Sequence, residues 1–465
     1  MYVIKNLIVP FSWNCMLLCI AAILPMTAIA ADPFSTDDRL KYGQLDQATD
    51  VRHCAKEKIR SPLTLADVVD LALCNNPQTR SLWASSRVQA AQVGVSTAAY
   101  LPTLSATGNV SNNQTQTGSQ NPVNSLSQSA SLTASYLLYD FGGRSASLEN
   151  AKQLLIAANA TRDATLQSNF LSAIQAYYTL LSARASVESF KADEAKAQES
   201  LAAALARYQA GVATPVDRLQ AQTTLSQAKL NRIKGEGEVN NAQGALANIM
   251  GFDATQQYTL QPLPEVAPDQ VIEKDIGKLI AEARLKRPDL AAAESQIRAA
   301  EAQLQATNAT GRPSITLGAM AGISNPEIKS SSIGITLSVP LFSGFKTNYQ
   351  ARAAEAQIEG KIAERDRLAN QIALDVWKAY QGMLTNSQAL RSAEDLVVAA
   401  TQSEQMVLGR YKAGVGNILD TLTAQSALAN ARQQRVAAFY NFLISRFALA
   451  QAIGQLDLTQ LSIQN

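Results

Sequence analysis

The residue types that carry most protein chemistry are scarce in this chain of 465 residues. It has a single histidine, His53, and four cysteines, none of them in a CxxC pair. Histidine-based metal centres and Ser-His-Asp triads depend on imidazoles that this composition hardly supplies. Zinc fingers and iron–sulfur clusters need closely spaced thiolates. We therefore expect no metal, no cofactor and no enzyme activity.

The charge balance excludes further classes. Forty Lys and Arg residues against 38 Asp and Glu residues give a net charge of +2, and charged residues make up 17% of the chain, compared with about 25% in ordinary soluble proteins. A mean hydropathy of −0.06 with so little net charge argues against disorder and against a polybasic nucleic-acid binder. The sequence also lacks a GxxxxGK[ST] nucleotide-binding string.

The first 30 residues have the pattern of a secretory signal peptide. Lys5 is their only charged residue, an apolar stretch runs from Cys15 to Ile29, and Ala28-Ile29-Ala30 fits the small-residue cleavage rule. The alternatives are an uncleaved membrane anchor and lipidation at Cys19, which no small residue closely precedes.

Two cysteines, Cys54 and Cys74, follow this segment. An exported chain folds in an oxidising compartment, so we expect the two to form a disulfide. The alternative is a pair of buried free thiols.

An internal duplication organises the chain. The string Arg207-Tyr208-Gln209-Ala210-Gly211-Val212 recurs as Arg410-Tyr411-Lys412-Ala413-Gly414-Val415, an offset of 203 residues from 207 to 410. The same offset carries Asp217 onto Asp420. We divide the chain into a signal peptide (1–30), a first repeat (31–251), a proline-rich connector (252–275), a second repeat (276–454) and a C-terminal tail (455–465).

Each repeat changes its apolar periodicity twice, from helical to strand-like and back. The predicted elements of the first repeat are a helix over 64–98, a strand pair within 103–139, a long helix over 143–210 and a helix over 215–250. Those of the second are a helix over 276–309, a strand pair within 314–342, a long helix over 345–413 and a helix over 418–454. By length alone, we expect 215–250 to stack end to end with 276–309, and 64–98 to complete the other pair. Beyond residue 31 no apolar run approaches a membrane-spanning length.

Strand length links this pattern to a membrane. A tilted strand of about ten residues crosses a bilayer. Four strands are too few to close a barrel, because the smallest membrane barrels have about eight. Three chains would supply twelve, and the long helices, all joined to one end of the strands, would extend such a barrel as a tube about 100 Å long. We expect a trimeric conduit from an outer membrane into the space beneath it.

The motifs, in their order, resemble the outer membrane efflux protein family, the TolC-like outer membrane factors. The resemblance rests on the duplicated turn, on strand entries at Pro102 and Pro313, and on three further strings. These are Arg287-Pro288-Asp289-Leu290, Leu138-Tyr139-Asp140-Phe141-Gly142-Gly143 and Pro340-Leu341-Phe342-Ser343-Gly344.

The resemblance implies a mainly α fold with a membrane β-barrel: a trimeric 12-stranded transmembrane β-barrel continued by a 12-helix periplasmic α-barrel, with two repeats per chain. It implies the outer membrane exit duct of a tripartite efflux or type I secretion system, in the cell outer membrane with a large periplasmic portion. The implied partners are two further copies of the chain, a periplasmic adaptor (membrane fusion protein), an inner-membrane transporter of RND or ABC type and outer membrane lipid, with no nucleic acid.

The resemblance also assigns residue roles. It places Asp420, Asp217 and Tyr411 at the pore gate, although helix capping is an alternative role for both aspartates. Some members have an acidic residue and an arginine where this chain has Thr423 and Gly416. The predicted adaptor contacts lie at the two turns, where a purely local role in ending the helices is the alternative; they are Arg207, Tyr208, Gly211, Val212, Arg410, Gly414 and Val415.

Aromatic residues divide into two predicted groups. Tyr136, Tyr139 and Phe342 are candidates for an aromatic belt at the membrane boundary, with strand packing as the alternative. Four others sit at helical spacing and are expected in the core: Trp83, Trp377, Tyr177 and Tyr380.

The main rival function is a periplasmic coiled-coil adaptor or scaffold. Such a protein would carry one long hairpin flanked by soluble β domains, whereas this sequence has two hairpins, each preceded by strands of membrane-spanning length.

Overall fold

The computed structural model describes residues 32–40, 62–116, 118, 121–261, 275–325 and 328–456. The predicted signal peptide, His53, Cys54, most of the connector and most of the C-terminal tail lie outside these residues.

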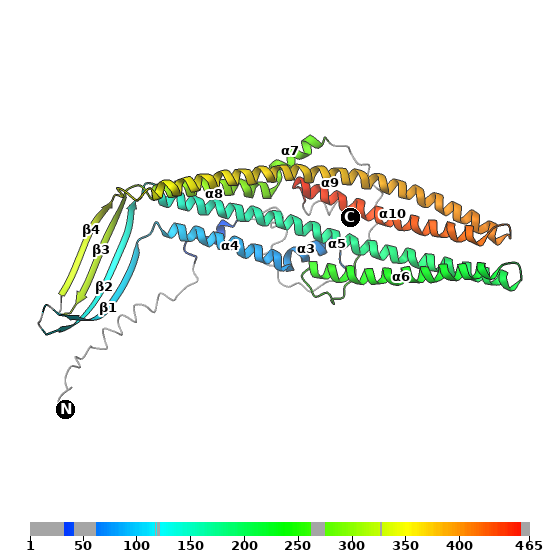
Figure 1. Ribbon diagram of the computed structural model, residues 1–465, viewed down its shortest axis with the longest axis horizontal. Helices are drawn as coiled ribbons and strands as arrows, with labels where there is room; N and C mark the ends of the chain where they lie inside the picture. The colour runs from blue at the N-terminus through cyan, green and yellow to red at the C-terminus, as the bar shows by residue number, and fades with distance from the viewer. Residues whose placement is uncertain are drawn as a thin grey trace, which may run out of the picture.

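A four-stranded antiparallel sheet forms one end of the molecule, and two helical hairpins form the other (Figure 1). The strands are β1 (Thr103–Thr115), β2 (Val123–Tyr139), β3 (Ser314–Ser324) and β4 (Ile328–Ser338), and they lie side by side in sequence order. β2 and β3, from different repeats, pair directly. Within the described residues, β1 and β4 are paired on one side only.

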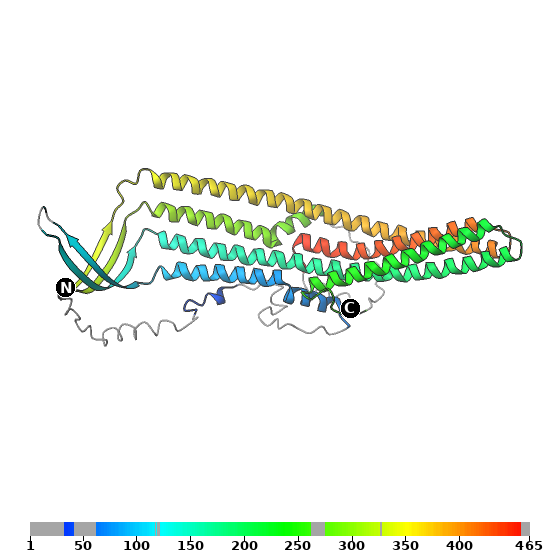
Figure 2. The same cartoon turned by 60° about the horizontal axis from the view of Figure 1, so that its bottom comes forward.

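Two helices of 67 residues run the length of the molecule, α5 (Gly143–Gln209) and α9 (Lys346–Lys412). Each turns back into a shorter helix, α6 (Pro215–Ile249) after α5 and α10 (Ile418–Ile453) after α9. Near the sheet, α4 (Pro77–Ala98) packs on α5, and α8 (Pro288–Ala309) fills the space between α5 and α9 (Figure 2). Near the hairpin turns, α10 takes the place of α8, and α6 that of α4.

The short helices are joined within each repeat. Asn76, before α4, donates its Nδ2 to the carbonyl oxygen of Ile249 at the end of α6, at 3.4 Å. Gly454, after α10, lies against the backbone of Arg287, before α8. The expected stacking of 215–250 with 276–309 is therefore wrong. Helix length alone does not show whether α6 stacks on α4 or on α8. It stacks on α4 because both helices pack along α5.

Each helix predicted before a strand pair is broken in two. α3 (Leu65–Asn75) ends before Pro77, and α7 (Ile276–Lys286) ends before Pro288. Proline forces the preceding residue out of the helical region, and Asn76 and Arg287 have ψ angles of 124° and 123°. A short 3₁₀ turn, η2 (Asp37–Arg39), precedes these helices in the chain.

The largest apolar core lies at mid-length, where α3, α5, α6 and α10 meet around Phe170, Tyr177 and Tyr178. Burial raises the pKa of Tyr177 to about 12. Trp83 and Tyr380 are buried as expected, but Trp377 is 49% exposed, so its assignment to the core is wrong. Helical spacing identifies a face without showing whether a neighbour covers it.

One described helix, α10, is long and apolar enough to cross a membrane, with a mean hydropathy of 1.4 over 18 residues. This differs from the expectation that no such segment follows residue 31. One helix of this kind is weak evidence for a span, because core helices pass the same test, and α10 packs along α9 and α5.

Candidate functional site: the tips of the two helical hairpins

The duplicated sequence motif builds the same turn at both hairpin tips. Gly211 and Gly414 have φ angles of +73° and +83°, a region that glycine enters without steric cost. Val212 donates its amide to the carbonyl of Arg207 at 3.0 Å, and Val415 does so to Arg410 at 3.0 Å. These bonds satisfy carbonyls that the helix end leaves open.

The helices that leave the two turns begin differently. In the first tip, Thr214 and Asp217 form a reciprocal capping box, in which the Thr214 amide donates to the Asp217 carboxylate at 2.8 Å. In the second tip, Asn417 caps the amide of Leu419 at 3.0 Å. Asp420 is exposed, and no hydrogen bond or ion pair of its carboxylate is found among the residues that the structure describes. Asp217 therefore has a structural use that Asp420 does not share.

An arginine of the first tip holds a tyrosine of the second. Arg207 donates Nη1 to the carbonyl oxygen of Tyr411 at 2.8 Å, and its guanidinium lies 4.8 Å from the centre of the Tyr411 ring. Tyr411 is 4% exposed, and burial raises the pKa of its hydroxyl, an effect that the Arg207 charge opposes. The predicted gate residue Tyr411 and the predicted adaptor contact Arg207 thus meet in a contact between the hairpins, which we call the Arg207–Tyr411 contact.

The remaining predicted adaptor contacts lie at the surface. Val212 is 63% exposed and Val415 is 71% exposed, both at the extreme end of the molecule. Arg410 is exposed, and Tyr208 is 37% exposed with the guanidinium of Arg218 at 5.5 Å from its ring. Gly211 and Gly414 are exposed in the turns themselves.

Polar side chains that the sequence analysis did not single out join the two hairpins above the tips. Ser200 on α5 exchanges hydrogen bonds with Gln425 on α10, at 3.1 and 2.9 Å. Three ion pairs flank this contact: Lys196–Glu404 at 3.0 Å, Lys412–Glu199 at 2.8 Å and Arg432–Asp193 at 3.2 Å. Burial raises the pKa of Asp193, opposed by Arg432. Helical periodicity does not show which residues meet on neighbouring helices, so no sequence pattern predicts these pairs.

A groove runs between α6 and α10 from the tips toward mid-length. Its end near the turns is a hollow of about 720 Å³, lined by apolar residues such as Val216, Leu219 and Leu419. It continues into a hollow of about 350 Å³ lined by charged residues that include Asp193 and Arg432.

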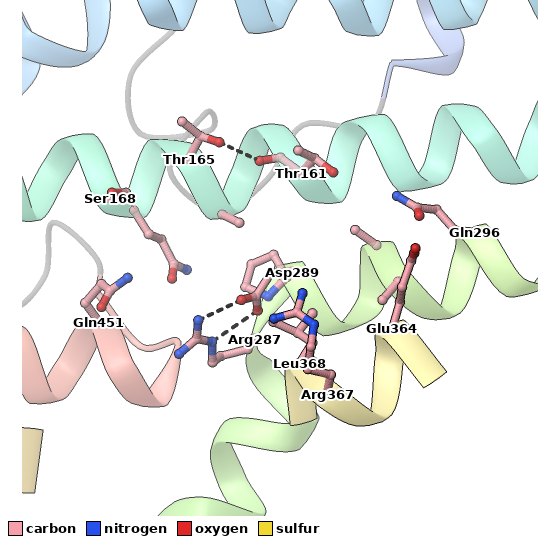
Figure 3. A pocket seen from close by; sticks show the side chains of 15 residues that line it. Thr161, Thr165, Ser168, Arg287, Asp289, Gln296, Glu364, Arg367, Leu368 and Gln451 are labelled. Atoms are coloured by element: carbon pink, nitrogen blue, oxygen red, sulfur yellow. Dashed lines mark hydrogen bonds and ion pairs between the residues drawn. The ribbon is translucent and has the colours of Figure 1, made fainter. Parts of the chain in front are cut away.

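A third hollow, of about 690 Å³, lies at mid-length, between α5, α8 and α9 (Figure 3). Arg287, in the string Arg287-Pro288-Asp289, binds both oxygens of Asp289 at 3.1 and 2.6 Å and reaches Asp375 on α9 at 3.3 Å. Of the charged residues that line the hollow, Arg287 therefore joins the start of α8 to α9, whereas Glu364 pairs with Lys361 on its own helix.

Only one cysteine of the predicted disulfide lies within the described residues. Cys74, on α3, is disulfide-bonded. Because Cys54 lies outside the described residues, its pairing with Cys74 stays a prediction. In the part of the chain that the structure describes, no group of His, Cys, Asp and Glu side chains has the arrangement of a metal site.

Comparison with known proteins gives one consistent result. The model of the outer membrane efflux protein family matches residues 68–252 and 279–455. Protein CyaE of Bordetella pertussis is 30% identical over 408 residues, covering 85% of this chain and 84% of that protein. Outer membrane protein TolC of Vibrio cholerae is 26% identical over 407 residues, covering 84% and 91%.

Solved structures show the same fold. The outer membrane protein VceC of Vibrio cholerae superposes with a TM-score of 0.73 at 21% identity, covering 84% of this chain and 96% of that one. The outer-membrane channel OprN superposes with a TM-score of 0.76 at 20% identity, covering 92% and 97%.

Proposed function

The chain belongs to the outer membrane efflux protein family, and we infer from this membership that it is the exit duct of a tripartite efflux or type I secretion system. It is an outer membrane channel, and the members of its family are channels rather than enzymes. The observation that carries this conclusion is that the family model covers both repeats, with the hairpin tips included.

We propose that three chains assemble into the functional duct. The four-stranded sheet has two open edges within the described residues, and four strands are too few for a closed barrel. Three such sheets joined edge to edge would form a barrel of twelve strands. The helices, which form a wall four helices wide at each level, would join in the same way into a tube of twelve helices.

The hairpin tips are the proposed docking surface for a periplasmic adaptor, which would link the duct to an inner-membrane transporter. Exposed Val212 and Val415 at the extreme end of the molecule support this assignment, because apolar side chains gathered at one exposed end are typical of an interaction site. Relatives carry names such as "Toluene efflux pump outer membrane protein TtgC", of Pseudomonas putida, 25% identical to this chain. In an efflux system the cargo of such a duct is a small molecule, and in a type I secretion system it is a polypeptide.

Asp420 is the proposed gate residue. Its carboxylate is exposed and is not used to cap α10, so three copies would place three free negative charges around the entrance. A ring of this kind attracts cations. Asp217 is a weaker candidate, because its carboxylate is engaged by the Thr214 amide.

The test combines location, mass and conductance. The full-length protein, expressed with its export signal, is expected in the outer membrane fraction, with a mass in detergent of three chains and an ion conductance in planar lipid bilayers. Recovery of a monomer from the soluble periplasmic fraction would contradict the duct and favour the coiled-coil adaptor or scaffold.

A further inference from the structure

The internal duplication relates contacts between the hairpins inside the chain to equivalent positions that do not contact each other in the described part of the chain. The Arg207–Tyr411 contact joins repeat one to repeat two. The offset of 203 residues carries Arg207 onto Arg410 and relates Tyr411 to Tyr208. The chain therefore has a second arginine and tyrosine of the same kind, with the arginine, Arg410, in the second repeat and the tyrosine, Tyr208, in the first.

The hydrogen-bonded pair above the tips follows the same rule. Ser200 on α5 and Gln425 on α10 bond to each other. The offset carries Ser200 onto Ser403 and relates Gln425 to Gln222, so this pair also recurs with identical residue types.

The residues that pair between the hairpins and their equivalents in the other repeat differ in burial. Tyr411 is 4% exposed and Ser200 is 2% exposed, since each lies between the hairpins. Their counterparts Tyr208 and Ser403 are exposed, as are Arg410 and Gln222. For the side chains of Arg410, Ser403 and Gln222, no hydrogen bond or ion pair is found within the described part of the chain. The pairs that join the hairpins inside the chain therefore have exposed equivalents, and among these only Tyr208 has a side-chain partner in the described residues, the guanidinium of Arg218.

Ring closure would supply the missing partners. Inside the chain, the first hairpin meets the second through α5 against α10. The offset relates α5 to α9 and α10 to α6, so the equivalent interface is α9 of one chain against α6 of the next. In a closed ring built from two-hairpin chains, hairpins of the two repeats alternate, and every second interface lies between chains.

We propose that Arg410 of one chain binds Tyr208 of a second copy through its backbone carbonyl and ring, and that Ser403 of the same chain exchanges hydrogen bonds with Gln222 of that copy. This interface rests on the proposed trimer, and it adds the residues that join the tips of neighbouring chains. Two of the ion pairs that join the hairpins inside the chain have no such counterparts, because Lys196–Glu404 maps onto Ala399 and Leu201, and Arg432–Asp193 onto Lys229 and Leu396.

A thiol cross-linking experiment on the full-length protein in outer membranes tests this interface. The double variant Ser403→Cys, Gln222→Cys is treated with a short bifunctional thiol reagent and analysed on a denaturing gel. We expect covalent products with the masses of two and three chains. The matched control is Ser200→Cys with Gln425→Cys, which reproduces the contact seen inside the chain and is expected to give only a cross-linked single chain of altered mobility.

The outcomes separate this interface from the trimer itself. Each single variant and the unaltered protein, with its native cysteines, should give no ladder. If the control pair reacts and the mass in detergent is that of three chains, but the Ser403→Cys, Gln222→Cys variant gives no ladder, the proposed interface is wrong while the trimer stands. A mass of one chain would instead contradict the proposed duct.

A second measurement addresses Arg410. Arg410→Ala should lower the temperature at which the trimer dissociates, and Tyr208→Ala should do so too. The double variant should lose less than the sum of the two single losses, because both remove the same contact. Strictly additive losses would contradict a direct contact.

Discussion

Asp217 and Asp420 occupy equivalent places in the two repeats, but only one of them serves to begin a helix. Asp217 completes a capping box with Thr214, whereas Asn417 caps α10 without Asp420. The sequence placed both aspartates in the first helical turn and left capping and gating as alternatives. The type of the N-cap residue separates the two, because Asn417 bonds the amide of Leu419, one residue before Asp420.

This difference predicts that the two alanine variants change different properties of the protein. Asp420→Ala should leave thermal stability unchanged, and it should raise single-channel conductance or weaken block by cations in planar bilayers, because it removes a ring of charge. Asp217→Ala should cost about 1 kcal/mol of stability per chain through loss of the cap. An unaltered pore in Asp420→Ala would contradict the gate assignment.

Glycines that follow helix ends also differ in what surrounds them. Gly251 and Gly414 have φ angles of +78° and +83°, so alanine is strained at both. A Cβ on Gly251 would lie 2.6 Å from the backbone oxygen of Asn75, whereas a Cβ on Gly414 would meet open space. Gly414→Ala should therefore cost about 1–2 kcal/mol for the left-handed conformation alone, and Gly251→Ala should cost more. Thermal unfolding followed by circular dichroism measures both losses of stability. Equal losses would contradict the prediction, because they would mean that the backbone of Asn75 moves away from the new Cβ at no cost.

The tip residues show what the sequence could and could not predict of the site. The turns follow from Gly211 and Gly414, because a local glycine signal is sufficient to end a helix. The Arg207–Tyr411 contact was not predicted, because it joins residues about 200 positions apart and depends on which hairpins meet. Arg207 and Arg410 have the same local sequence, and only packing distinguishes them.

The two hairpins are held together by polar contacts along α5, and one of these depends on pH. Lys412 donates Nζ to Glu199 at 2.8 Å, and this bond lowers the pKa of Glu199 below its ordinary value. A carboxyl group with a lowered pKa in the folded state stabilises the fold above its unfolded pKa. That contribution is lost as the pH falls through the folded pKa.

Removing Lys412 should therefore have a cost that depends on pH. Lys412→Ala should lower stability at pH 7, by no more than about 1 kcal/mol because the pair is exposed. The loss should vanish at an acidic pH below the lowered pKa of Glu199, where its carboxyl group is protonated. In a Glu199→Gln background the same substitution should have little effect at either pH. Thermal unfolding of the four variants checks this, and an equal loss at both pH values would rule out the ion pair as its source.

At the scale of the elements, local sequence signals predicted which helices exist better than they predicted which helices pack together. The long helices end within one or two residues of their predicted limits, because Gly142, Gly211, Gly344 and Gly414 mark them. The breaks before Pro77 and Pro288 were missed, although the restriction that proline places on the preceding residue was visible in the sequence. The stacking of 215–250 with 276–309 was predicted wrongly, because the partner of α6 is α4, and this depends on which face of α5 each helix covers.

At the scale of the whole molecule, the chain is an open wall rather than a closed body. The sheet continues through four helices into two hairpins (Figure 1). Near the tips, Tyr411 and Ser200 are buried, whereas the equivalent Tyr208 and Ser403 are exposed. The strand alternation predicted the sheet, and the duplication predicted its two halves. The number of chains in the assembly depends on curvature and edge pairing, which no periodicity within one chain determines.

The sheet provides a test of which face meets lipid. On β4, exposed Ile333, Ile335 and Leu337 alternate with Gly334, Thr336 and Ser338, and Leu317 on β3 pairs with Ile335. Residues directly opposite in a sheet share a face, so the apolar side chains of β3 and β4 form one continuous surface.

Ile335→Lys and Thr336→Lys place the same charge one residue apart on opposite faces of this sheet. A lysine on the lipid face of a barrel costs about 2–4 kcal/mol near the bilayer midplane, and each of three chains would bear that cost. A lysine on the other face would point into a water-filled channel. We therefore expect Ile335→Lys to reduce the amount of protein in the outer membrane and to abolish heat-modifiable gel mobility, while Thr336→Lys assembles and alters ion selectivity. Normal assembly of both variants would contradict the lipid-facing assignment, because only one of the two faces can be in water if the strands cross a membrane.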